Sequence, residues 1–191
     1  MGIICDTCAI LMLIRIAPQL FIDKQYDCYT IHEARDELFK TPKFKERYPW
    51  RNNYKSNVEC LTLSHVQKSK FKQYFGAIGL VLNNCAIDKQ TGKVLDLSYT
   101  DKSIIAYALV CEYKISSGDD KLIRFAKQEF PDEFKGLISP LGVINLWLKE
   151  GIFVWRDEFD KYISDWKNEA PQPQNEIVRF EKLTKKKYLG L

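Results

Sequence analysis

Carboxylate side chains occupy positions in this 191-residue sequence where an α/β protein places its chemistry. Asp6 directly follows an apolar run at residues 3–5, and Asp119 follows a second short run at residues 113–116. Asp101 opens the helical pattern that leads into that second run. Ligands of parallel α/β sheets bind outside the carboxyl ends of the strands. We therefore expect these three acids to lie close together at one edge of a sheet.

A fourth acid, Glu37, lies on the predicted helix at residues 32–40. Ile31, Ala34 and Leu38 form the apolar side of that helix. At about 100° per residue, Glu37 is the acid of the helix that lies closest to this side. We expect its side chain to point inward over the sheet.

Several carboxylates at one sheet edge would repel one another, and burying them unpaired is costly. A divalent cation removes this conflict, and hard oxygen donors favour Mg²⁺ or Mn²⁺ over zinc. Such an ion lowers the pKa of a bound water and neutralises charge on a leaving oxygen. The chemistry that these residues predict is metal-assisted hydrolysis of a phosphodiester.

The composition is that of a globular protein, with 46% hydrophobic and 13% aromatic residues. A chain of this length can bury the core of one domain, and its composition excludes disordered and collagen-like proteins. The most apolar stretch, residues 3–22, contains Asp6, Arg15 and Pro18, so we expect no membrane span. Because the sequence opens without an export signal, we predict a cytoplasmic protein.

Short apolar segments alternate with helical patterns, which predicts an α/β fold with a mainly parallel sheet. The predicted strands are residues 3–5, 26–30, 113–116 and 136–139. The predicted helices are residues 9–17, 32–40, 64–75 with a continuation or a paired turn at 77–82, one that begins at 101, one that begins at 119 or 120, 140–150 and 156–166. We divide the chain into a domain at residues 1–168, with a basic insertion around 40–72, and a Pro-containing linker with a basic C-terminal tail at 169–191.

The acids lie within four motifs that occur in a fixed order. The motifs are Ile4-Cys5-Asp6-Thr7, the segment 30–38 that ends in Glu37-Leu38, Leu97-Ser98-Tyr99-Thr100-Asp101 followed by Ile105 and Ala106-Tyr107-Ala108, and Ser117-Gly118-Asp119 followed by Leu122 and Ala126. Together they resemble the PIN-domain ribonucleases over roughly residues 3–150.

This resemblance implies a Rossmann-like, three-layer fold with a central, mainly parallel sheet of four or five strands. It also implies an acidic cluster that binds Mg²⁺ or Mn²⁺ and cleaves RNA. The catalytic and metal-binding residues would be Asp6, Glu37, Asp101 and Asp119, supported by Ser117, Thr7 and Asp120. The fourth acid stays open between Asp119 and Asp120. Many family members are toxins of toxin–antitoxin pairs, so a small antitoxin and a homodimer are the implied protein partners.

Positive charge is concentrated in the insertion at residues 40–72, which has nine Lys or Arg and two acidic residues. Aromatic residues are interleaved with these bases, a pattern that suits single-stranded nucleic acid, because cations contact phosphates and rings stack on bases. The predicted RNA-binding residues are Lys43, Lys45, Arg47, Trp50 and Arg51. The alternative is a solvated loop whose aromatic residues anchor it to the core.

Two other functions fit parts of the pattern. One is a non-catalytic PIN-like module that binds RNA or a protein, because Cys8 stands where the family commonly has Asn. The other is a phosphorelay receiver, which shares the topology but needs paired acids after its first strand, where this chain has Asp6 alone. Neither a nucleophile triad nor a glycine-rich phosphate loop is present in the sequence.

Overall fold

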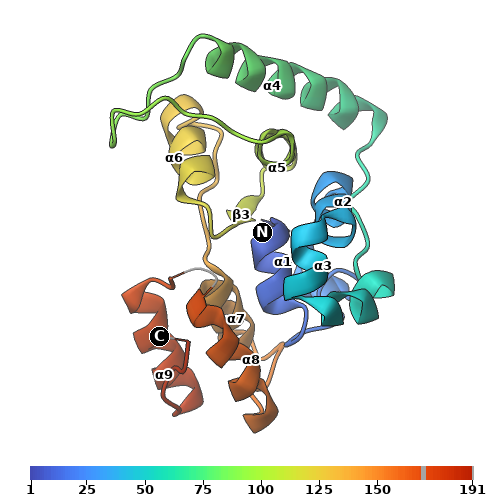
Figure 1. Cartoon of the computed structure of the whole chain (residues 1–191), viewed down its shortest axis with the longest axis vertical. Coiled ribbons are helices and arrows are strands. Elements are labelled where there is room, and N and C mark those ends of the chain that lie inside the picture. The colour runs from blue at the N-terminus through green and yellow to red at the C-terminus, as the bar shows by residue number, and fades with distance from the viewer. Residues whose placement is uncertain (169–170, 191) are drawn as a thin grey trace.

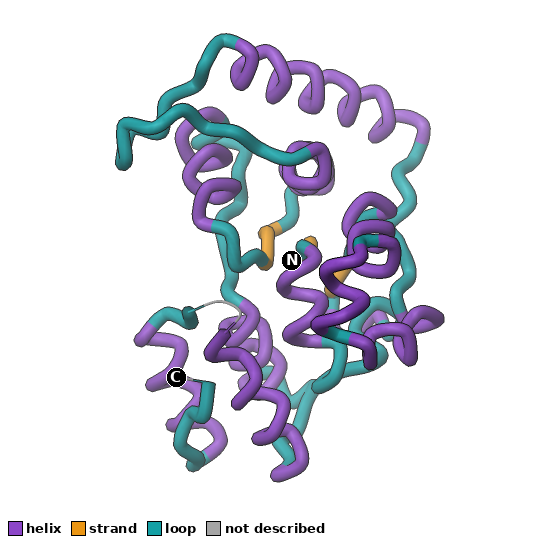
Figure 2. Tube along the Cα trace, viewed as in Figure 1, coloured by secondary structure: helices purple, strands orange, loops and turns teal. Residues whose placement is uncertain are grey.

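A computed structural model describes residues 1–168 and 171–190, apart from the side chains of Lys43, Lys167 and Asn168. Three short parallel strands form its sheet: β1 (Ile3–Cys5), β2 (Cys28–Tyr29) and β3 (Lys114–Ser116). Their order is β2-β1-β3, with Ile4 of β1 paired to Tyr29 and to Ile115. Helices surround this small sheet (Figures 1 and 2), so the predicted α/β class is confirmed.

The two connections between the strands run in opposite directions across the sheet, one from β1 to β2 and the other from β2 past β1 to β3. Helix α1 (Thr7–Leu13) lies in the connection from β1 to β2, whereas α5 (Tyr99–Cys111) precedes β3 and packs against both β1 and β3. Parallel crossovers are right-handed, so connections that run in opposite directions place their helices on opposite faces of a sheet. Helix α1 therefore covers one face of β1 and α5 the other.

The middle of the chain is largely helical. Helix α2 (His32–Lys40) has the predicted bounds and buries Ala34 and Leu38. Helix α4 (His65–Asn83) is continuous across the two predicted segments, begins with a capping box between Ser64 and Gln67, and packs chiefly against α5. Figure 1 shows α4 as an outer arm that crosses above α5, away from the sheet.

The remaining helices and 3₁₀ turns connect and flank these elements. They are η1 (Lys24–Tyr26), α3 (Pro42–Arg47), η2 (Pro49–Asn57), α6 (Asp120–Glu129), α7 (Pro140–Lys149), η3 (Asp157–Phe159), α8 (Asp160–Ser164), η4 (Asp165–Asn168) and α9 (Gln174–Thr184). The single helix predicted at 156–166 is thus divided into three shorter turns. None of the helices in the described residues combines the length and the apolar character needed to cross a membrane.

The sheet is smaller than the four or five strands that we predicted. The segment 136–139 forms no strand in the described structure, and only Leu137 pairs with Ile115, in an isolated parallel bridge. Gly136 has a φ of +100°, outside the extended range, and Ser139 already caps α7. Too few residues remain between these two points to extend a ladder.

The C-terminal segment differs from the expected linker and basic tail. Its residues 169, 170 and 191 lie outside the described structure. Helix α9 packs against α7 and buries Ile177 and Phe180, while Tyr188 beyond it is also buried. The Asn145 side chain of α7 donates to Glu176 of α9 at 2.7 Å. Ile177, Phe180 and Tyr188 are therefore part of the core.

Arg51, predicted to bind RNA, instead closes the C-terminal end of α2. It is 2% exposed, and its guanidinium donates to the carbonyl groups of Leu38 at 2.7 Å, Phe39 at 3.4 Å and Tyr48 at 3.3 Å. The last carbonyls of a helix lack partners within the helix, and a cation there also favours the helix dipole. The RNA-binding assignment of Arg51 was wrong, because its donors satisfy the helix that carries Glu37.

Replacing Arg51 by Met should lower the free energy of unfolding by about 2–4 kcal/mol, because buried carbonyls lose their donors while the volume is kept. Urea denaturation measures this change. The matched control is Lys45→Met, an exposed site on α3, which should stay within about 0.5 kcal/mol of the original chain. Equal stability of the two variants would contradict the capping role.

Candidate active site

All four predicted acids line one cavity of about 440 Å³: Asp6, Glu37, Asp101 and Asp119. We call it the acidic cavity. It lies beyond the carboxyl ends of β1 and β3, between strands whose following connections run to opposite sides of the sheet. Such a divergence opens a crevice, and it is where open α/β sheets bind ligands.

Asp6 is the most enclosed of the four acids, with 8% of its surface exposed. One carboxylate oxygen accepts from the Ala9 amide at 2.6 Å and so caps α1, and the other accepts from the Ser117 hydroxyl at 2.5 Å. Burial, together with the negative charges of Asp101 and Asp119, raises the pKa of Asp6 to about 7 against the opposing effect of these two hydrogen bonds. The site therefore holds a carboxyl that titrates near neutral pH.

Ser117 joins the ends of the two strands. Its hydroxyl donates to Asp6 and accepts from the Asp119 amide at 2.8 Å. The Asp119 carboxylate caps α6, because it accepts a hydrogen bond from the Lys121 amide at 2.7 Å, and it lines the acidic cavity. The Asp120 side chain is 88% exposed and is not among the residues that line this cavity, so the geometry favours Asp119 as the fourth acid.

Glu37 enters the cavity from α2, as its position on the helix predicted. The Thr7 hydroxyl donates to Glu37 Oε2 at 2.8 Å, which ties α2 to the start of α1. Thr7 is itself buried and lines the cavity. The hydrogen bond is consistent with the supporting role expected of Thr7.

Asp101 lies in the first turn of α5, where it forms a capping box with Ser98. Its Oδ2 accepts from the Ser98 amide at 3.0 Å and from the Ser98 hydroxyl at 2.7 Å. Burial raises the pKa of Asp101, with a further contribution from Asp119, while the Ser98 hydrogen bonds and Lys121 oppose the shift. Ser98 was assigned no role from the sequence, although the spacing Ser-x-x-Asp before an apolar run is the signature of a capping box.

The donor set fits Mg²⁺ or Mn²⁺ by its chemistry. Four carboxylates supply hard oxygen ligands, and burial together with the charges of Asp101 and Asp119 raises the pKa of Asp6. Each carboxylate nevertheless accepts from a local donor, and within the described residues no three Asp, Glu, His or Cys side chains converge as a formed metal site. Binding an ion would require these side chains to turn from their present partners.

The predicted RNA-binding residues are not all at the acidic cavity. Arg47 lines it together with Phe44 and Tyr48. Lys45 is exposed on α3, and the side chain of Lys43 lies outside the described structure. Trp50 is half-buried beside Tyr48, with ring centroids 5.9 Å apart, and lines a neighbouring cavity.

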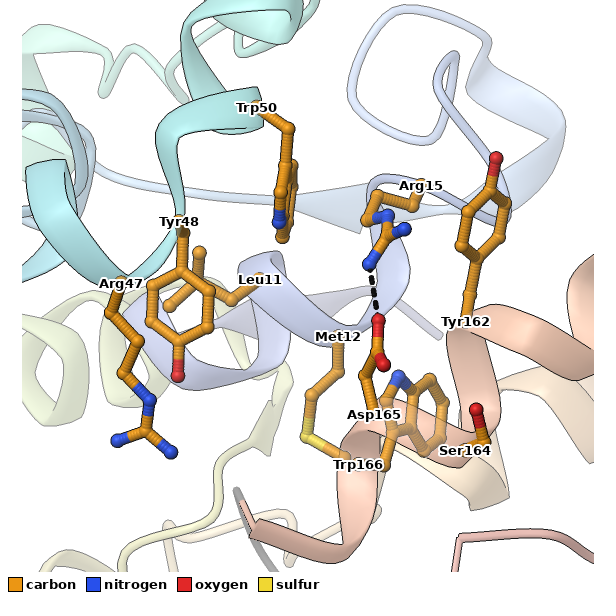
Figure 3. A pocket seen from close by; sticks show the side chains of 10 residues that line it. All are labelled: Leu11, Met12, Arg15, Arg47, Tyr48, Trp50, Tyr162, Ser164, Asp165 and Trp166. Carbon is orange, nitrogen blue, oxygen red and sulfur yellow. Dashed lines mark hydrogen bonds and ion pairs between the residues drawn. The ribbon is translucent and has the colours of Figure 1, made fainter.

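This second cavity, of about 470 Å³, shares Leu11, Arg47 and Tyr48 with the acidic cavity (Figure 3). We call it the aromatic cavity. The described residues that line it are Leu11, Met12, Arg15, Arg47, Tyr48, Trp50, Tyr162, Ser164, Asp165 and Trp166. The sequence does not indicate that residues 162–166 belong to this cavity, because only tertiary packing brings them to α1.

The free energy of unfolding of the Asp6→Asn variant, relative to that of the original chain, should increase as the pH rises. The raised pKa means that folding favours protonated Asp6, so the penalty is absent below the unfolded pKa of about 4 and complete above about 7. In EDTA, the variant should gain up to about 4 kcal/mol relative to the original chain between pH 4 and pH 8. Urea denaturation at both pH values measures the gain. Asp36→Asn, an exposed acid of α2, is the control and should show none; a pH-independent difference for Asp6→Asn would contradict the raised pKa.

The acidic cavity is interpreted from its own residues and geometry. The motif resemblance to PIN-domain ribonucleases stays a prediction. No protein-family model, no curated protein and no solved structure matches this chain.

Proposed function

We propose that the protein is a metal-dependent, PIN-like ribonuclease that hydrolyses RNA phosphodiester bonds. The observation that carries this proposal is that acids from four separate segments line one cavity at the ends of β1 and β3. Structural roles explain each acid singly, because Asp6, Asp101 and Asp119 cap helices and Glu37 accepts a hydrogen bond from Thr7. It does not explain why Asp6, Glu37, Asp101 and Asp119 share a cavity despite their mutual repulsion.

Asp6, Glu37, Asp101 and Asp119 would hold Mg²⁺ or Mn²⁺, which supplies an activated water and neutralises charge on the leaving oxygen. Ser117 positions two of these acids, through its hydrogen bonds to the Asp6 side chain and to the Asp119 backbone. Thr7 holds Glu37 toward the cavity. The buried hydroxyl groups of Ser117 and Thr7 thus position the acids by hydrogen bonds and take no part in the reaction.

RNA is the substrate that the charge around the cavity favours. A cluster of carboxylates repels a polyanion, so nearby cations must bind the phosphates. Arg47 lines the acidic cavity itself, and exposed Lys45 lies on the same short helix. These two residues are our proposed phosphate contacts. In a toxin–antitoxin pair of the cytoplasm, a small antitoxin would inhibit the site by inserting a basic side chain.

A non-catalytic PIN-like module is the second candidate. The specific observation in its favour is that every carboxylate accepts a hydrogen bond from a local donor, with no formed metal site among the described residues. The two candidates share RNA contacts and differ in the response of the acids to divalent ions.

Asp6→Asn and Asp101→Asn should each reduce RNA cleavage about 100-fold or more, because loss of about 3 kcal/mol of ion-derived stabilisation gives such a factor. The assay follows a mixed single-stranded RNA pool in Mg²⁺ or Mn²⁺, with EDTA as the blank. Asp36→Asn, which removes an exposed acid paired with Lys40, should cleave normally. Both site variants should still bind RNA. Metal-independent cleavage, or unchanged cleavage by both variants, would contradict the assignment of a metal-dependent nuclease site to the acidic cavity.

Binding of the ion can be measured apart from cleavage. Mn²⁺ at about 100 times its dissociation constant should stabilise the original chain by about 2.7 kcal/mol, which raises Tm by about 5–10 °C. The double variant Asp6→Asn with Asp101→Asn should lose this shift, and Asp36→Asn should keep it. Calorimetry in a titration of MnCl₂ measures the effect. An equal shift in the double variant would place the ion elsewhere.

A further inference from the structure

The aromatic cavity continues the acidic cavity along one side of α1. Cys8 and Leu11 line the acidic cavity, while Leu11, Met12 and Arg15 line the aromatic cavity. From Asp6 to Met12 the helical rise amounts to about 9 Å, the length of about two to three stacked nucleotides. A strand with a phosphate at the acids can therefore place a nearby base in the aromatic cavity.

The walls of the aromatic cavity are suited to a flat, aromatic ligand. In Figure 3 the Trp50 indole and the Tyr48 ring stand opposite Asp165 and Trp166, with Met12 between them. Met12 and Trp166 are almost fully buried and provide a firm apolar floor. The volume of about 470 Å³ lies within the range of small-molecule pockets. Trp50 is only half-buried, so it can contact both the protein and a ligand.

Arg15 provides a polar side to this cavity. Its guanidinium carbon lies 4.8 Å from the Trp50 ring centroid and 4.0 Å from that of Tyr162. Its Nη1 donates to Asp165 Oδ2 at 2.7 Å. The pair brings donors and an acceptor side by side at the cavity, and the 61% exposure of the Asp165 side chain leaves it accessible. Base edges likewise carry adjacent donors and acceptors.

We propose that the aromatic cavity binds one unpaired base of the RNA, close to the bond that is cut at the acidic cavity. This inference rests on the proposed function and adds to it a specificity site for one base. A base held in a duplex cannot present its faces to Trp50 and its edge to the Arg15–Asp165 pair. Arg47 and Tyr48 line both cavities, where they would contact the backbone between the base and the cut.

Charge favours RNA over a peptide as the occupant. Residues 42–57, which contribute Arg47, Tyr48 and Trp50, contain five Lys or Arg, of which Arg51 is buried as a helix cap, and a single acid. Arg47, at the junction of the two cavities, lies where the phosphates of a bound strand would run. Aromatic rings beside such cations bind single strands by stacking and by phosphate contact together.

The first test separates stacking from packing at Trp50. Trp50→Leu keeps an apolar side chain without a ring, whereas Trp50→Phe keeps a ring. Binding of a fluorescent 12-nucleotide single-stranded RNA is measured by anisotropy, in the Asp6→Asn background with EDTA. Trp50→Leu should weaken binding about tenfold and Trp50→Phe much less. The control is Tyr74→Leu on α4, whose half-buried ring packs near Phe130 outside both cavities. Thermal unfolding establishes that each variant is folded.

The second test reads specificity from the cut sites in a random RNA pool. The original chain should prefer one base at a single position near the cut. Asp165→Asn exchanges an acceptor for a mixed donor and acceptor and should change that preference, while Trp50→Leu should weaken it. Duplex RNA of the same sequence should bind more weakly than the single strand, and its affinity should not depend on Trp50.

The outcomes separate this inference from the proposed function. Metal-dependent cleavage with no effect of Trp50→Leu on affinity or preference overturns the base site and leaves the nuclease. Equal losses in Trp50→Leu and Trp50→Phe also overturn it, because packing would then explain both. Binding that depends on the Trp50 ring, without cleavage under any metal, supports the base site and overturns the nuclease. Absence of RNA binding by the original chain overturns both and points to a protein partner.

Discussion

The buried Asp6 carboxylate, where two adjacent strands end, is the constraint on which the rest of the site depends. Asp6 must be satisfied almost without water, so the chain surrounds it with the Ala9 amide and the Ser117 hydroxyl. The first interaction starts α1, and the second fixes the end of β3 against the end of β1. A single carboxylate thus links the start of the helix to the ends of both strands at the cavity. Burial and the nearby charges of Asp101 and Asp119 make this arrangement costly, which is typical of sites kept for function.

Helix α2 is held near its C-terminal end by two separate interactions. The Thr7 hydroxyl of α1 donates to Glu37, while Arg51 donates to the carbonyl of the next residue, Leu38. The insertion that follows α2 therefore has two roles, because Arg51 turns inward and Arg47 faces the cavities. Positive charge in a sequence segment does not by itself distinguish these roles. Only the packing of η2 against α2 assigns each residue to one of them.

The sequence was most informative where local chemistry decides the structure. The triplet of apolar residues in β1 and the amphipathic pattern of α2 predicted both elements with their bounds. The strand-end positions of Asp6 and Asp119, with Asp101 at the start of the helix before β3, predicted that the three acids would meet. Prediction failed where distant contacts decide. Gly136 takes a positive φ that a strand pattern does not reveal, and α9 is anchored by α7. The aromatic cavity joins Arg15 to Asp165, 150 residues apart, a proximity that local periodicity does not encode.

Helix α4 has a consequence for the dynamics of the site. It packs chiefly against α5 and fully buries only Ile78 among its side chains. A helix with a single main neighbour can detach in a local opening that costs less than global unfolding. Such an opening would expose to solvent the side of α5 that α4 covers, while β1, α1 and α2 stay folded. The amides of α4 should then exchange with solvent before those of α1, and Asp101 would be the acid whose backbone gains freedom first.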